Sequence, residues 1–310
     1  MIDRNSPLNK GWLHGCALLL FIDSQHIRKA MNSPLILLAD NGSGKAASVL
    51  NLRRLAKQLS DQSNKQVYPV SLQHAHKIPR SELNGMPADT LRLFLQQKLI
   101  EGERNFLLIP LFFGVSRALT SFIPRQVETL EAEFGQFKLN QGAVLYPLHE
   151  GEPRLAEIIF DQIQARARGE KIEHIILVDH GSPLSQVSQV RKRIAQDLRC
   201  LFDSNIPITE TVMERRKGPE YDFNGDLLED QISQIARSTP DIALDLAQLF
   251  ISPGRHAGPG GDIEKICERA TATYPHLKIR ISPPVGQHDK IVHILTDRLN
   301  SALANRLESP

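Results

Sequence analysis

The sequence predicts an α/β protein made of two similar doubly wound parallel-sheet halves that are related by pseudo-twofold symmetry. Three observations support this prediction. The chain has 310 residues, which is long enough for about two domains. Short apolar runs alternate with amphipathic stretches, as in parallel sheets that have helices on both faces. The second half of the sequence also repeats landmarks of the first half at nearly constant spacing.

The first predicted strand, residues 34–39, is a continuous apolar run of the kind that is buried on both faces of a parallel sheet. A turn follows at 40–44, and the next amphipathic stretch predicts a helix over about 47–59. In the second half, strands are predicted at 174–178, 207–213, 242–250 and 277–282, and helices at 186–202, 225–237, 262–273 and 287–305. Each half therefore alternates strands with helices.

The internal repeat is visible as four matched blocks. The first aligns Asp40, Gly42 and Ser43 with Asp179, Gly181 and Ser182. The others align Lys77, Pro79, Asn84 and Gly85 with Lys217, Pro219, Asn224 and Gly225; Leu111, Phe112 and Arg117 with Leu249, Phe250 and Arg255; and Tyr146-Pro147 with Ser282-Pro283. We interpret this as a tandem duplication with halves at 34–165 and 172–305, joined by the charged stretch 166–173.

Composition excludes several classes of partner. Hydrophobic residues make up 41% and charged residues 23% of the chain, which is typical of a soluble globular protein. The formal net charge of +2 gives no general electrostatic reason to bind nucleic acid or an anionic membrane. Aromatic residues, at 5%, are too few for the stacking surfaces of single-strand binders. We therefore expect neither a nucleic acid nor a membrane as partner.

The cysteines and the N-terminal segment bear on location. Cys16, Cys200 and Cys267 are odd in number and form no CxxC pair, so neither a disulfide framework nor a thiolate zinc site is expected, and a reducing cytoplasm is favoured. The apolar run 16–22 is far below the roughly 20 residues that span a bilayer, and no signal-peptide cleavage pattern follows it. We expect an irregular extension at 1–33, with Met31 as a candidate natural start.

Three residues at predicted strand ends are the candidates for chemistry. His180 follows the strand 174–178, His256 follows the strand 242–250, and Glu214 ends the strand between them. Ligands of doubly wound sheets bind beyond the carboxyl ends of the strands. Imidazole is a good ligand for divalent iron, cobalt, nickel or zinc, and a carboxylate takes up protons or completes such a site. The alternative is that each histidine is an ordinary core or loop residue.

The segments around these residues resemble the sirohydrochlorin metal chelatases, a class II family that needs no ATP. The resemblance covers 174–305 and rests on Asp179-His-Gly-Ser182, Met213-Glu-Arg-Arg-Lys-Gly-Pro219, Pro253-Gly-Arg-His-Ala-Gly-Pro-Gly-Gly-Asp262 and Ile281-Ser-Pro-Pro-Val-Gly286. It implies a chelatase-like, flavodoxin-like fold and a lyase of siroheme or cobalamin synthesis. It also implies that His180 and His256 face one cleft and act at the metal.

The first half resembles the same family more weakly. Asn41 replaces the first histidine and Ala118 replaces the second, while the repeat alignment sets His74 opposite Glu214. We expect this half to supply the opposite wall of the cleft, with Arg117, His74 and also His76 available there. The alternative for His74 and His76 is a solvated loop. Because the duplication supplies both walls, we expect a monomer.

Metal insertion into a tetrapyrrole sets three requirements. The macrocycle must be held and bent, two N–H protons must leave, and the metal must lose water and be transferred. His180 or His256 suits either of the last two tasks, as base or as transient ligand, because the ordinary histidine pKa of about 6.5 lies near working pH. Two imidazoles hold a metal more loosely than the four ligands of a structural zinc site. The metal is therefore expected as a substrate, Fe²⁺, Co²⁺ or Ni²⁺, with no nucleotide.

The carboxylates of such a tetrapyrrole require cationic and polar partners. The candidates are Arg255, Arg117, Arg215, Arg216 and Ser182, together with His74. The alternative for the run 215–217 is a solvated charge cluster. Arg117 and Arg255 occupy equivalent positions in the two halves of the repeat. This also favours a shared role in shaping the loop in which each of them lies.

Other patterns are weaker. Residues 42–45 resemble a phosphate loop, but Ala39 and Ala46 stand where the motif needs Gly and Ser or Thr. Ser182 lacks the G-x-S-x-G context of a nucleophile elbow. The competing functions are a non-catalytic carrier of a tetrapyrrole or a metal, which the loss of histidine at Asn41 and Ala118 suggests, and a chelatase for another metal or a related tetrapyrrole.

Overall fold

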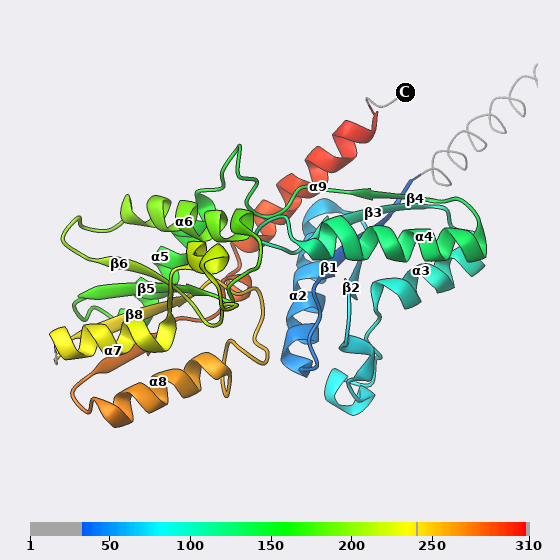
Figure 1. Ribbon diagram of the computed structural model, residues 1–310. Coiled ribbons are helices and arrows are strands. Elements are labelled where there is room, and N and C mark those ends of the chain that lie inside the picture. Colours follow the sequence, from blue (N-terminus) through cyan, green and yellow to red (C-terminus); the bar gives the residue numbers. More distant parts are fainter. Residues whose placement is uncertain (1–32, 240, 308–310) are drawn as a thin grey trace, which may run out of the picture.

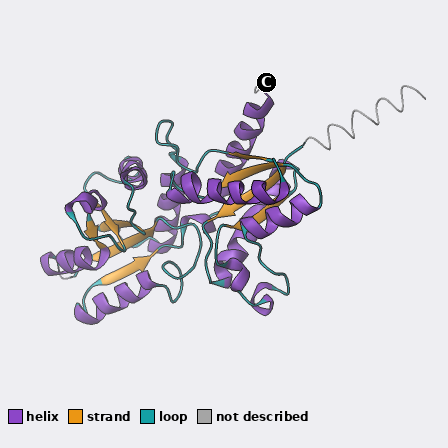
Figure 2. Ribbon diagram, turned by 45° about the vertical axis from the view of Figure 1, so that its right-hand side comes forward, coloured by secondary structure: helices purple, strands orange, loops and turns teal. Residues whose placement is uncertain are grey.

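The computed structural model describes residues 33–239 and 241–307 and has two parallel sheets, one in each half of the chain (Figure 1). The first sheet has four strands in the order β2-β1-β3-β4, and the second has five in the order β7-β6-β5-β8-β9. Helices cover both faces of each sheet, and Figure 2 shows the strands as two separate groups. The predicted fold class is confirmed. The predicted extension at 1–33 lies, except for its last residue, outside the described residues.

The first half follows the predicted alternation. Its elements are β1 (Leu35–Asp40), α2 (Ala46–Ser63), β2 (Val67–Ser71), α3 (Leu91–Ile100), β3 (Asn105–Pro110), α4 (Ile123–Phe134), β4 (Lys138–Gln141) and α5 (Arg154–Ala167). Short helical segments lie in its loops: η1 (Ala75–Lys77), η2 (Arg80–Leu83) and the π-helical η3 (Ala118–Phe122). Helix α2 extends four residues beyond its predicted end and stops at Asn64, which adopts the left-handed conformation.

The second half repeats this order. Its elements are β5 (His174–Asp179), α6 (Ser185–Arg199), β6 (Ile208–Val212), η4 (Pro219–Asn224), β7 (Asp226–Leu227), α7 (Leu228–Ser238), β8 (Ala243–Gln248), α8 (Asp262–Thr273), β9 (Lys278–Ile281), η5 (Val285–Gln287) and α9 (Ile291–Leu307). The helices predicted from 225 and from 287 begin later, because β7 takes 226–227 and the η5 turn occupies the entry to α9.

The repeat is present in the strand pairing. Strand β1 pairs with β2 and β3, and β5 pairs in the same way with β6 and β8. The amide of Leu72 donates to Asp40 O at 2.8 Å, and the amide of Met213 donates to Asp179 O at 2.9 Å. The carboxyl ends of the two central strands are therefore built alike.

The two halves exchange their last helices. Helix α5, from the first half, packs against α6, β8 and β9 of the second half, whereas α9, from the second half, packs against α2 and β3 of the first (Figure 1). Arg298 of α9 is buried and donates to Val144 O at 2.9 Å and to Glu152 Oε2 at 2.9 Å. One hydrophobic core runs through both halves, including Leu38, Leu52, Ile158, Leu177 and Leu295.

No helix in the described part of the chain is long and apolar enough to span a bilayer.

Candidate functional site

His180 and His256 lie side by side at the carboxyl ends of β5 and β8. Their ring centroids are 4.8 Å apart and the rings meet edge to face at 79°. The two strands are neighbours, with Val178 paired to Gln248, so the turn after β5 and the loop after β8 leave the sheet together. Two histidines that are 76 residues apart in the sequence thus form one cluster, as the strand-end argument predicts.

Glu214 joins this cluster through both its backbone and its side chain. Its amide donates to His180 O at 3.2 Å, and its Oε1 lies 3.2 Å from His180 Nε2. The turn depends on Gly181, which has φ +89°, because a Cβ at this position would collide with Glu214 O. The sequence Asp-His-Gly-Ser therefore places His180 against Glu214.

The ring nitrogens of His180 both face oxygen atoms. Nδ1 lies 3.2 Å from Gly181 O, and Nε2 faces the Glu214 carboxylate. A carbonyl oxygen only accepts, so Nδ1 carries a proton. Nε2 lies 3.2 Å from the Glu214 carboxylate, a distance at which a proton can pass between the two groups.

The ring of His256 is oriented differently. Its Nδ1 lies 2.9 Å from Asp262 Oδ2, so Nδ1 donates and Nε2 is left as the acceptor nitrogen. The loop is fixed to the start of α8, because the Ile263 amide donates to His256 O at 3.0 Å. Asp262 was not among the predicted site residues. The signal for it was an acidic residue in the first turn of a predicted helix, six residues after a strand-end histidine.

The side chains of the cluster are accessible to solvent. The side chains of His180, Glu214 and His256 are 46%, 65% and 25% exposed. Among the described residues no group of three or more His, Cys, Asp or Glu side chains is arranged to hold a metal ion.

The arginines near the cluster differ in how firmly they are held. Arg255 is 78% exposed, and its Nε lies 3.7 Å from Asp262 Oδ2. Arg215 donates to Asp222 Oδ1 and Gly225 O, both at 3.2 Å. Arg216 lies over the ring of Tyr221, 5.8 Å from its centroid. Arg255 and His256 share the Asp262 carboxylate as a partner.

Ser182 shapes the turn that follows His180. Its hydroxyl accepts a hydrogen bond from the Leu184 amide at 3.0 Å, and its own amide donates to Asn224 Oδ1 at 3.0 Å. These bonds give Ser182 a local structural role, and its predicted contact with substrate remains a prediction.

The first half meets the His256 loop from the opposite side. A Cβ on Gly254 would lie 3.5 Å from Ser43 Oγ, and Asn51 donates to Ser252 Oγ at 2.9 Å. The turn that carries Asn41 in place of a histidine therefore adjoins the loop of His256. His74, His76 and Arg117 are exposed, and no hydrogen bond or ion pair between described residues joins them to His180 or His256.

The predicted counterpart of Glu214 was wrong by one residue. Leu72 and Met213 bond to equivalent strand ends, so the next residue, Gln73, corresponds to Glu214. A Cβ on Gly42 would collide with Gln73 O, as one on Gly181 would with Glu214 O. The alignment failed because the loop between Gln73 and the matched Lys77 is one residue longer than its counterpart in the second half. His74 instead has an unusual positive φ of 66°.

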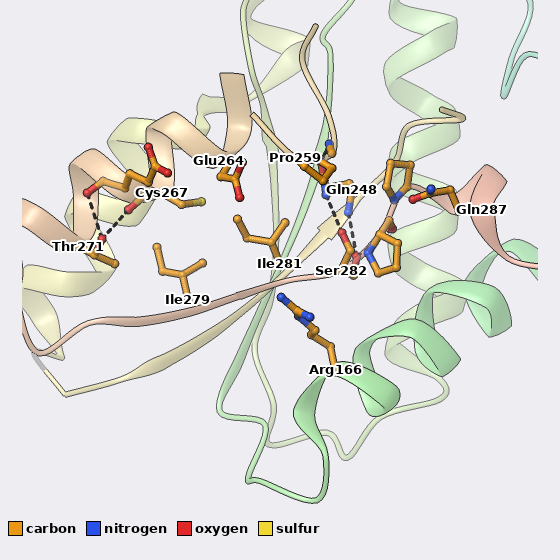
Figure 3. Close-up of a pocket in the computed structure, with 14 residues that line it drawn as sticks. Arg166, Gln248, Pro259, Glu264, Cys267, Thr271, Ile279, Ile281, Ser282 and Gln287 are labelled. Atoms are coloured by element: carbon orange, nitrogen blue, oxygen red, sulfur yellow. Dashed lines mark hydrogen bonds between the residues drawn. The ribbon is translucent and has the colours of Figure 1, made fainter. Parts of the chain in front are cut away.

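A pocket of about 490 Å³ lies along β9, and none of the predicted site residues lines it (Figure 3). Glu264 and Cys267 come from α8, Gln248 from the end of β8 and Arg166 from α5. Burial raises the pKa of the Cys267 thiol to about 12, so this thiol is unreactive at neutral pH. The pocket is distinct from the histidine cluster.

Comparisons with known proteins show which family and which solved structures this chain resembles. The profile of the CbiX family matches residues 174–302, which confirms the resemblance of the second half. Among solved structures, SirB from Bacillus subtilis with Fe³⁺ is 12% identical with a TM-score of 0.66, and covers 89% of this chain and 98% of its own. The sirohydrochlorin chelatase SirB from Bacillus subtilis subspecies spizizenii in complex with cobalt is 11% identical with a TM-score of 0.63, covering 88% and 96%.

A third similar structure is CbiX, described as the terminal enzyme for biosynthesis of siroheme in denitrifying bacteria. It is 17% identical with a TM-score of 0.54, and covers 87% of this chain and 99% of its own. At these identities the similarity establishes a shared fold, and it does so over both halves. No curated protein sequence matches the chain.

Proposed function

Residues 174–302 match the CbiX family, and on that premise we propose that this chain is a sirohydrochlorin chelatase that inserts Fe²⁺ or Co²⁺ without ATP. The observation that carries the proposal is the contact of His180 with both His256 and Glu214 at the carboxyl edge of the second sheet. This cluster combines an acceptor imidazole with a proton-exchanging pair, and metal insertion needs both.

His256 serves as the ligand that receives the metal. Its Nδ1 is engaged by Asp262, so the lone pair of Nε2 is directed away from that carboxylate. A carboxylate that fixes the tautomer of an imidazole also raises its basicity as a ligand. One or two imidazoles and exchangeable water hold a divalent metal weakly enough to release it to four pyrrole nitrogens.

His180 and Glu214 serve as the proton acceptor. Each insertion releases two protons from the tetrapyrrole, and an imidazole bonded to an exposed carboxylate takes them up in turn and passes them to water. The 3.2 Å contact between Nε2 and Oε1 provides this route. Because Glu214 is exposed, protons leave without crossing the protein interior.

The acidic side chains of the tetrapyrrole are bound by cations around the cluster. Arg255 is the strongest candidate because its side chain is exposed and it directly precedes His256 in the loop after β8. Arg215 and Arg216 line the segment after Glu214, and Arg117 and His74 are the candidates on the first half. The β1–α2 turn, which reaches Gly254, supports a role for the first half as the facing wall.

The metal itself is a substrate. The similar SirB structures hold Fe³⁺ and cobalt, which supports iron or cobalt as the cargo, with Ni²⁺ as a further candidate. Nitrogen donors bind the later divalent metals in one general order of affinity, so the choice between siroheme and cobalamin synthesis follows from the metal supplied.

A second candidate is a non-catalytic carrier of a tetrapyrrole or a metal. It is favoured by Asn41 and Ala118, which leave the first half without either histidine. A carrier would bind the metallated product tightly and would not accelerate insertion above the spontaneous rate.

The test is an anaerobic insertion assay with Fe²⁺, Co²⁺ and Ni²⁺ side by side, followed by the absorbance change of sirohydrochlorin without nucleotide. We expect metal-dependent turnover by the wild type and its loss in His180→Ala and His256→Ala. His276→Ala is the matched control, because His276 is 78% exposed and contacts Asp241. Unchanged turnover in both site variants contradicts the assignment, and binding without turnover supports the carrier.

Location and assembly follow the same reasoning. We propose a cytoplasmic location, because the sequence has an odd number of cysteines and no CxxC pair. Both walls of the site belong to one chain, which supports a monomer.

A further inference from the structure

A buried polar network lies beneath the turn that carries His180. Arg191 of α6 is only 1% exposed. Its Nη1 donates to Asp179 Oδ1 at 2.7 Å and its Nη2 donates to Asn224 O at 2.6 Å. The same Asp179 oxygen accepts the Gly181 amide at 2.9 Å. Arg191 therefore fixes the residue before His180 directly and the residue after it through Asp179.

The side chain of Asn224 completes the network. Asn224 is fully buried, and its Oδ1 accepts from the Ser182 amide and from Ser188 Oγ, both at 3.0 Å. Its Nδ2 donates to Ser182 O and Tyr221 O, both at 3.0 Å. The side-chain amide of Asn224 thus makes two hydrogen bonds to the backbone of Ser182, as a neighbouring strand would. It fastens the turn of His180 to the segment that follows Glu214.

Burying such a polar network in the protein interior costs free energy. A buried guanidinium loses its hydration, and an apolar side chain of similar volume often gives equal or greater stability. Arg191 Nε has no hydrogen-bond partner, and Glu210 Oε2 lies 3.7 Å from it. The network is therefore poorly explained by stability alone.

The first half shows what the same turn needs in order to fold. Leu52 corresponds to Arg191 and Val49 to Ser188, and both are buried apolar residues. Leu83 ends η2 as Asn224 ends η4, one residue before the Asn84 that the sequence repeat aligns with Asn224. Leu83 packs with Val49 in an apolar cluster where Asn224 bonds to Ser188 in the second half. Gly42 nevertheless adopts φ +87° and closes on Gln73, as Gly181 closes on Glu214. The turn forms without the network, and the half without the network is also the half without the histidines.

We propose that Arg191, Asn224 and Ser188 are positioning residues that hold the His180 imidazole against Glu214 during metal insertion. The catalytic consequence rests on the proposed function, whereas the effect on the geometry of His180 does not. The network restricts the Asp179–Ser182 backbone from below, so an arriving macrocycle displaces neither the imidazole nor the carboxylate that accepts its protons.

The test replaces the network by the apolar residues that fill its place in the first half, as Ser188→Val, Arg191→Leu and Asn224→Leu in one protein. We expect a cooperatively folded protein in which the NMR signals of the His180 ring nitrogens, recorded at one fixed pH, move or broaden while those of His256 stay in place. The kcat for insertion should fall about 10- to 100-fold with KM within about twofold, as for a displaced catalytic group.

Two further variants make the result decisive. Arg191→Lys keeps the charge beside Asp179 but cannot reach Asn224 O as well, so it should displace the His180 signals in the same direction even if the triple variant does not fold. Arg193→Leu is the control, because Arg193 is exposed on the same helix and bonds to Gln196 rather than to the turn, and it should leave the His180 signals unchanged. If the His180 signals of the triple variant and of Arg191→Lys are the same as those of the wild type, the proposal is wrong. If the wild type inserts no metal, the proposed function fails and the His180 signals still decide the role of the network.

Discussion

Asp40 and Asp179 end the central strands of the two sheets at equivalent positions, yet only Asp179 faces a cation. Asp179 is paired with Arg191 at 2.7 Å, whereas Leu52 stands at the position of Arg191 in the first half. Asp40 Oδ1 is buried without a hydrogen-bond partner. Burial raises the pKa of Asp40 from 3.8 to about 6, opposed by hydrogen bonds from Ser71 and the Gly42 amide.

Burial also raises the pKa of Asp179, opposed there by Arg191. The raised pKa of Asp40 predicts a pH-dependent stability. The folded state binds the Asp40 proton more tightly than the unfolded chain does, so the free energy of unfolding should fall as pH rises through about 4 to 6. Asp40→Asn should remove this loss and be more stable than the wild type at pH 7.5, by at most about 3 kcal/mol at about 1.4 kcal/mol per pKa unit. Denaturant unfolding at pH 4.5 and 7.5 measures it. Asp61→Asn, on exposed α2 surface, is the control, and equal pH slopes in wild type and Asp40→Asn would refute the prediction.

Gly181→Ala should disrupt the His180 turn. The added Cβ would collide with Glu214 O, and the backbone has φ +89°. Gly135 has φ +79° with open space around it, so Gly135→Ala measures the cost of the positive φ alone, about 1 kcal/mol. We expect Gly181→Ala to be several kcal/mol less stable than Gly135→Ala by chemical denaturation, and to lose insertion activity. Equal losses of stability in the two variants would mean that the turn accommodates the methyl group.

Asp262→Asn should weaken metal binding at His256. The side-chain amide of Asn can donate as well as accept, so it no longer holds a proton on Nδ1 of His256, and part of the population has the wrong tautomer. Loss of such a partner costs about 10- to 100-fold in metal affinity. Co²⁺ titration followed by absorbance measures the change. Glu268→Gln, on the exposed face of the same helix, should bind as the wild type does. An unaltered affinity in Asp262→Asn would show that His256 does not receive the metal through Nε2.

Arg298→Met should destabilise both halves together. Arg298 is buried and connects α9 to Val144 O, Leu145 O and Glu152, so its removal leaves the buried Glu152 with Arg154 as its remaining partner. Breaking a buried ion pair costs about 3–5 kcal/mol. Calorimetry should show one transition at lower temperature, because one core runs through both halves. Two separated transitions would indicate that the halves unfold independently.

Much of this architecture was predictable from the sequence because it depends on local patterns. Buried parallel strands read as apolar runs, and the glycine beside His180 marks a turn that needs positive φ. The helix exchange was not predictable, since the apolar face of α5 looks the same whichever sheet it covers. Arg191 lies in an amphipathic helix whose polar residues are expected to face solvent, and its burial depends on the distant Asn224. The one-residue error at His74 arose because strand register, not residue identity, determines which residues correspond.

The exchange of α5 and α9 has a consequence for how such a chain can evolve. Two separate copies that traded their last helices would form a domain-swapped dimer, and here a single polypeptide joins them. Deleting the first half would remove the helix that covers β8 and β9, so that half stays indispensable although it lacks counterparts of His180 and His256. Mutation is then free to reshape the Asn41 and Ala118 loops, which makes the first half the natural place for a new substrate preference to arise.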